Sequence, residues 1–220
     1  MEAFYRSTTQ SKNNPSGAST GHRFRSKHFR HVSVVPALRM ALVRDGRLFE
    51  YLTSNAGSLR RNQPSALHYL ARRCMHWREL ATSEGDEACR ELGCAGARAL
   101  ARVAPSLEED DAAVLGMLAE VAYSYLAGVL PISDLEKILS LAEALGFPLF
   151  HPELYTMTSE LGRKKPGRMA STVYLLRGIG HGTDAQPCDP ALLEHAVRLL
   201  ESWGGEPNQN AWPEMVGAEG

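Results

Sequence analysis

The sequence predicts a mainly α-helical protein with one short strand or hairpin near its carboxyl end and no NAD-binding α/β domain. Three observations support this fold class. Apolar residues recur at helical spacing through most of residues 32–204, and proline and glycine divide them into runs of helix length. No glycine-rich phosphate loop follows a strand-like segment. With 220 residues, 44% of them hydrophobic, the chain can bury one sizeable core.

The two ends of the chain differ from this helical domain. Residues 1–31 are rich in Ser, Thr, Asn, Gly and basic residues without an apolar period, so we expect a flexible basic arm. The Gly-rich residues 205–220 predict a disordered tail. Basic residues interleaved with Phe24 and Phe29 would suit a nucleic acid or an acidic protein, but the net charge of -1 gives no global field that favours such a partner.

Three helical runs are predicted before residue 105. The first starts at Val32 and breaks at Asp45-Gly46, which indicates two helices or one kinked helix. The second follows Pro64, and the third extends over 86–103. The third run contains small residues that would pack inside the domain or form the contact of a homodimer; they are Ala88, Gly93, Ala95, Gly96, Ala97 and Ala99.

The apolar segment 112–130 predicts the most buried helix of the domain, beginning near Glu109. It is long enough to raise the question of a membrane span, but Glu120 lies near its centre and no Lys or Arg flanks it. We therefore expect a central core helix and no membrane association.

The last third of the domain contains clear signals for the starts and ends of its elements. Ser133 and Glu136 have capping-box spacing before an apolar stripe that ends at Gly146. A short helix is expected from Pro152 to Leu161, and β-forming residues at 171–176 predict a strand. Asp189, followed by Pro190, predicts the cap and first position of a final helix; its core-facing residues are Leu192, Leu193, Ala196, Val197, Leu200 and Trp203.

Cysteine usage favours a reducing compartment. Cys74, Cys89, Cys94 and Cys188 form no C-x-x-C pair, and the chain opens without a basic-then-apolar signal segment. We expect reduced thiols and a cytoplasmic location.

Four local patterns together resemble one enzyme family. They are SKNNPSGAS at 11–19, RMALVRDGRLFEYL at 39–52, LSLAEALGFPLFHPEL at 139–154 and VYLLRGIGHG at 173–182. In this order and at these spacings they are similar to segments of the sugar phosphate cyclases, the superfamily of 3-dehydroquinate synthase and 2-epi-5-epi-valiolone synthase. The resemblance implies a helical domain like the C-terminal half of 3-dehydroquinate synthase. In the family that domain works with an NAD-binding domain and holds zinc or cobalt beside the sugar phosphate.

The resemblance also implies that the metal site has lost its ligands. The positions of the family's Glu and its two metal-binding His fall on Pro36, Cys94 and Glu109. Pro36 cannot ligate through its side chain, whereas Cys94 and Glu109 are chemically capable ligands. Because buried cysteine more often packs than ligates, we expect no bound metal and no other cofactor.

Several polar residues of the family's substrate site are replaced as well. The resemblance places Arg39, at the start of the 39–52 segment, where the family has a lysine. The family's glycine-histidine motif, whose first histidine falls on Cys94, is preceded by an asparagine that becomes Glu91, and its second histidine becomes Arg98. An arginine keeps the positive charge but does not titrate near neutrality as a lysine can. The resemblance leaves the following residues as sugar phosphate contacts: Lys12, Asn13, and one of Lys164 and Lys165.

Three functions follow from these patterns. The first is a truncated, catalytically inactive cyclase homologue with a structural or regulatory role, or a gene remnant. The second is a metal-dependent cyclase subunit, a phosphorus-oxygen lyase, acting with a separate NAD-binding chain. The third is a nucleic-acid or acidic-protein binder acting through the basic arm. The sequence favours the first, with a homodimer or an NAD-binding subunit as the expected partner.

Overall fold

A computed structural model describes residues 34–84, 91–162 and 171–204, with side chains at 76–84 excepted. It contains eight α-helices and one hairpin within these ranges. The helices are α1 (Val34–Val43), α2 (Gly46–Arg60), α3 (Pro64–Glu84), α5 (Cys94–Val103), α6 (Glu109–Leu126), α7 (Ile132–Leu145), α8 (Glu153–Gly162) and α9 (Pro190–Gly204), and the strands are β1 (Thr172–Gly178) and β2 (His181–Pro187). The mainly α-helical class is thereby confirmed. The predicted arm and tail lie outside the described residues.

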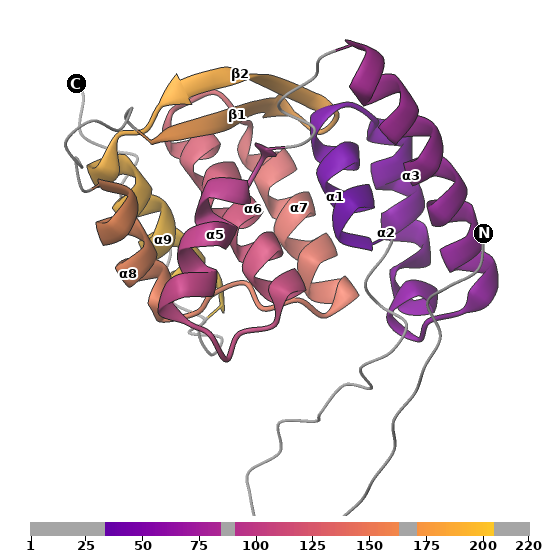
Figure 1. The fold of residues 1–220 in the computed structure, drawn as a ribbon, viewed down its shortest axis with the longest axis horizontal. Coiled ribbons are helices and arrows are strands. Elements are labelled where there is room, and N and C mark those ends of the chain that lie inside the picture. Colours follow the sequence, from indigo (N-terminus) through magenta and orange to yellow (C-terminus); the bar gives the residue numbers. More distant parts are fainter. Residues whose placement is uncertain (1–33, 85–90, 163–170, 205–220) are drawn as a thin grey trace, which may run out of the picture.

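Helix α6 is the centre of the domain. Helices α5, α7 and α9 and strand β1 all pack against it, and the hairpin lies across one side of the helices (Figure 1). Leu115, Leu118 and Val121 are fully buried, which confirms the prediction of a central core helix. Within the described residues no helix is long and apolar enough to cross a membrane.

The hairpin pairs its strands antiparallel, with Thr172 opposite Pro187. The predicted strand at 171–176 is confirmed as part of β1, whose Val173, Tyr174 and Leu176 are buried. Strand β2 has the sequence HGTDAQP and is mostly exposed. The sequence left open whether a single strand or a hairpin forms here, because a polar strand without alternating apolar residues has no period of two.

One predicted helix start is corrected. Helix α7 begins at Ile132 after Pro131 rather than at a Ser133 cap, and it has no side-chain capping bond. The helical run predicted over 86–103 is interrupted at Gly93, whose left-handed φ of 75° ends regular helix geometry, so that α5 begins at Cys94; its predicted start near 86 lies outside the described residues. The predicted Asp189 cap is confirmed, since its carboxylate accepts the Ala191 N–H at 2.9 Å.

The small residues of α5 allow close packing inside the domain. A Cβ built on Gly96 would lie 3.0 Å from the Gly116 Cα of α6, and Ala99 is fully buried. Gly93 is also buried, and it contacts Met117 of α6. Gly93 and Gly96 therefore lie against α6, and Ala99 is buried inside the domain.

Asp45 joins the first three helices. Its Oδ1 accepts the Leu48 N–H at 3.1 Å, which caps α2, and its Oδ2 lies 2.6 Å from an Arg73 guanidinium nitrogen on α3. The Asp45 side chain is 8% exposed and that of Arg73 is 36% exposed. One carboxylate thus fixes both the start of α2 and the position of α3.

We expect Asp45→Ala to lower the free energy of unfolding by about 2–3 kcal/mol, since it removes a helix cap and a half-buried ion pair. Asp45→Asn keeps an oxygen for the cap and should lose only about 1 kcal/mol. Urea denaturation of both variants measures the difference. Equal losses would contradict the separate roles of the two oxygens.

Candidate functional site

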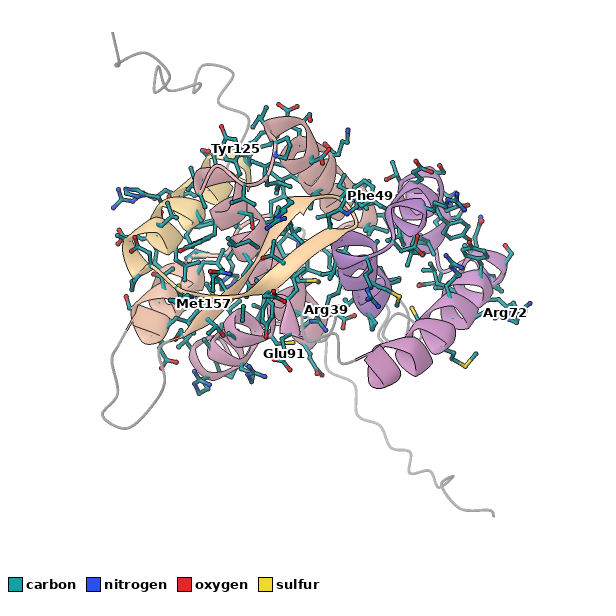
Figure 2. The ribbon with its side chains drawn as sticks, turned by 90° about the horizontal axis from the view of Figure 1, so that it is seen from above. Arg39, Phe49, Arg72, Glu91, Tyr125 and Met157 are labelled. Atoms are coloured by element: carbon teal, nitrogen blue, oxygen red, sulfur yellow. The ribbon has the colours of Figure 1, made fainter. Side chains whose placement is uncertain are left out.

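The polar residues that the sequence singled out meet at the turn that enters α5. Arg39 comes from α1, Glu91 precedes α5, and Cys94 and Arg98 lie on its first turns. The charges of Arg39, Glu91 and Arg98 all act on the Cys94 thiol, so the four side chains share one neighbourhood. Figure 2 shows Arg39 and Glu91 together beside the edge of the hairpin.

Arg39 holds the backbone of the turn before α5. Its Nε donates to the Leu92 carbonyl oxygen at 2.9 Å, which ties α1 to the turn before α5. The residue is half-buried within a helix whose neighbouring residues are almost all core. A guanidinium also keeps its proton at any physiological pH, so Arg39 can supply charge and hydrogen bonds but cannot act as a base.

Cys94 is a neutral thiol in this setting. Burial raises its pKa above the ordinary value, and the negative charges of Glu91 and Glu120 raise it further, while Arg39 and Arg98 lower it. The thiolate is the form that attacks electrophiles and binds metals. The site therefore weakens Cys94 both as a nucleophile and as a ligand.

Arg98 and Glu91 form the outer part of the cluster. Their closest charged atoms are 3.5 Å apart, and both side chains are substantially exposed. An exposed ion pair of this length contributes little to stability. These two residues are accessible to a ligand.

Glu120 is a buried carboxylate near the cluster that site reasoning from the sequence did not include. It is 4% exposed, and its Oε2 accepts the Tyr174 N–H of β1 at 3.0 Å. Burial raises its pKa from 4.5 to about 8, although hydrogen bonds from the Tyr174 and Gly93 amides and the charge of Arg39 lower it. Its signal was visible as the one carboxylate inside a long apolar run.

Ser124 continues this attachment one helical turn later. Its hydroxyl donates to the Glu120 carbonyl oxygen at 2.7 Å and accepts the Leu176 N–H at 3.0 Å. Two polar side chains of α6 therefore satisfy two amides of β1. Because the partners are buried, this arrangement fixes the hairpin on α6.

The other predicted site residues do not join the cluster. Pro36 is exposed on α1, and Glu109 is exposed in the first turn of α6. Glu109 precedes Gly116, the α6 residue that packs on Gly93, by two helical turns, or about 10 Å. The predicted sugar phosphate contacts Lys12, Asn13, Lys164 and Lys165 lie outside the described residues.

The donor set does not fit a metal ion. Among the residues that the structure describes, no three His, Cys, Asp or Glu side chains are placed to hold one. Pro36 has no donor atom, the Cys94 pKa is raised, and Glu109 is not among the charges acting on Cys94. Catalytic zinc ordinarily takes three protein ligands, which these side chains do not provide.

Comparison with known proteins finds similarity to a curated sequence and to solved structures, while no family model matches the chain. The 3-dehydroquinate synthase of Halorhodospira halophila is 26% identical over 161 residues, covering 68% of this chain and 45% of that protein. ValA, a 2-epi-5-epi-valiolone synthase from Streptomyces hygroscopicus subsp. jinggangensis 5008, was solved with NAD+ and Zn2+ bound. It matches with a TM-score of 0.66 and 23% identity, over 77% of this chain and 50% of that one.

These comparisons confirm the resemblance to the sugar phosphate cyclases that the local motifs predicted. The sequence match shows the similarity to 3-dehydroquinate synthase, and the structural match shows the similarity of the fold. The chain spans about half the length of the relatives it matches.

Proposed function

We propose that this chain is a catalytically inactive homologue of the sugar phosphate cyclases with a structural or regulatory role. The observation that carries the proposal is the set of residues at the metal-ligand positions. Pro36 has no donor atom, Cys94 has a raised pKa, and Glu109 is exposed two helical turns from the α5–α6 contact. Metal-dependent elimination needs a held ion at this point, and these side chains provide no complete ligand set.

The polar residues that remain support the same conclusion. Arg39 occupies the family lysine position but uses its Nε to hold the Leu92 carbonyl. The pKa of the buried Glu120 is about 8, so its carboxyl is largely protonated at neutral pH, and its Oε2 bonds the Tyr174 amide. Both groups join elements of the fold, whereas a reactive base would need a free lone pair facing substrate.

A second candidate is a cyclase subunit that acts with a separate NAD-binding chain. The clustering of Arg39, Glu91, Cys94 and Arg98 at one end of α5 favours it, because these are the positions that correspond to the family's chemistry. It would require a metal held by Cys94, Glu109 and a further donor. Metal content therefore separates the two candidates.

We expect the purified chain to contain well below one zinc or cobalt per molecule, measured by elemental analysis after dialysis. The matched test uses Cys94→Ala and Cys188→Ala, two half-buried cysteines of which only Cys94 belongs to the cluster. One tightly held metal that is lost with Cys94→Ala but kept with Cys188→Ala would contradict the proposal of an inactive homologue. It would favour the second candidate, the cyclase subunit.

A further inference from the structure

The outer face of α3 forms a groove that the cyclase resemblance does not use. It has a volume of about 530 Å3, and the described residues that line it are Ser65, His68, Tyr69, Arg72 and Arg73. Ligand sites for small molecules usually have volumes of about 300–1,000 Å3. Figure 2 shows Arg72 at one end of the molecule, whereas Arg39 and Glu91 lie near its middle, so this groove is separate from the α5 cluster.

Helical spacing brings these side chains to one face. Ser65, His68, Tyr69 and Arg72 follow each other at offsets of three, four and seven residues, which is one stripe of an α-helix. The opposite stripe is buried in the core, through Ala66, Leu70 and Cys74. The groove side chains therefore face outward because the other side of α3 is anchored.

Contacts with α2 and with its N-cap residue, Asp45, hold the groove side of α3 in place. The Arg73 guanidinium pairs with Asp45 at 2.6 Å, and the Tyr51 hydroxyl donates to the Ala66 carbonyl oxygen at 3.4 Å. The Tyr51 ring lies against the Tyr69 ring, with centroids 4.1 Å apart and planes tilted by 31°. Tyr69 thus remains 42% exposed while a second ring supports it.

The lining has the chemistry of an anion site. Arginine donates hydrogen bonds and accepts none, and serine and tyrosine hydroxyls and the imidazole can donate as well. No acidic residue lies between 64 and 75, and within the described part of the chain Arg72 has no ion-pair partner. Arg73 Nε is the single buried side-chain nitrogen or oxygen there without a hydrogen-bond partner.

From these contacts we propose that the α3 groove binds an organic phosphate of nucleotide size, with its phosphate at Arg72 and His68 and its planar ring on Tyr69. Guanidinium groups match phosphate oxygens with charge-assisted hydrogen bonds. An exposed tyrosine face can also stack on a planar ring, and this stacking tolerates different bases. The groove is larger than a free phosphate ion needs, which favours a ligand carrying both parts.

The test titrates the full-length chain with AMP, adenosine and inorganic phosphate by calorimetry at low salt. We expect AMP to saturate with a Kd of about 1 mM or tighter, and each fragment alone to bind about tenfold more weakly or worse. Adenosine or inorganic phosphate binding as well as AMP would overturn the two-part ligand. Absence of saturable AMP binding would overturn the site itself.

Variants locate the binding. Arg72→Ala should weaken AMP binding about tenfold, because it removes a charge-assisted hydrogen bond. Arg177→Ala, which removes an exposed arginine of β1, should leave the Kd unchanged. Tyr69→Leu, which keeps apolar bulk, should lose a factor of about five or more with AMP and nothing with inorganic phosphate.

Two further outcomes would overturn the assignment. Equal effects of Arg72→Ala and Arg177→Ala would mean that AMP binds through nonspecific charge. A single-stranded oligonucleotide that binds the chain far more tightly than AMP, and loses that affinity with Arg72→Ala, would make the groove part of a nucleic-acid surface instead. Circular dichroism of each variant verifies that the helices are intact.

Discussion

Gly93→Ala is expected to lower the free energy of unfolding by about 3–5 kcal/mol, or to prevent folding altogether. Gly93 has φ of 75°, and a Cβ there would lie 2.5 Å from the Met117 backbone nitrogen and 2.8 Å from its Cα. A left-handed alanine costs about 1 kcal/mol, and overpacking against backbone that cannot move adds about 1–3 kcal/mol or more. Guanidinium denaturation measures the loss.

The matched control is Gly128→Ala. Gly128 has a similar φ of 71°, but nothing lies within 4 Å of a Cβ placed there. This variant should lose only about 1 kcal/mol, the cost of the backbone conformation. If both variants lost the same free energy, the close approach of α5 and α6 at Gly93 would not contribute to stability.

The free energy of unfolding should also fall as pH rises from about 5 to 8, because of Glu120. Its folded pKa of about 8 lies above the ordinary value of 4.5, so the folded state binds an extra proton between these values. The stability from this group is complete below pH 4.5 and is lost as pH rises through 8. The slope approaches about 1.4 kcal/mol per pH unit.

Glu120→Gln tests this dependence while keeping a hydrogen-bond acceptor for the Tyr174 amide. We expect the variant to lose most of the slope between pH 5 and 8 and to be more stable than wild type at pH 8. Glu143→Gln, on the exposed side of α7, should retain the wild-type slope. A wild-type slope in Glu120→Gln would assign the proton to groups other than Glu120.

Much of the candidate site could be predicted from local motifs. Arg39, Glu91, Cys94 and Arg98 were identified as the positions where the resemblance places polar and metal-binding residues of the cyclases, and the structure brings them to one end of α5. Glu120 could not be assigned a role in this way. Its partners are amides at Tyr174 and Gly93, which come from separate parts of the chain.

The sequence by itself determined the helical class, the buried α6 and the Asp189 cap, because periodic burial and capping depend on residues a few positions apart. Only the tertiary structure decided that α5 starts at Cys94, that β2 pairs with β1, and that Pro131 rather than Ser133 precedes α7. The tertiary structure alone also decided the protonation of Glu120 and the hydrogen bond from Arg39 to the Leu92 carbonyl. They depend on desolvation and on partners more than fifty residues away, which no local pattern encodes.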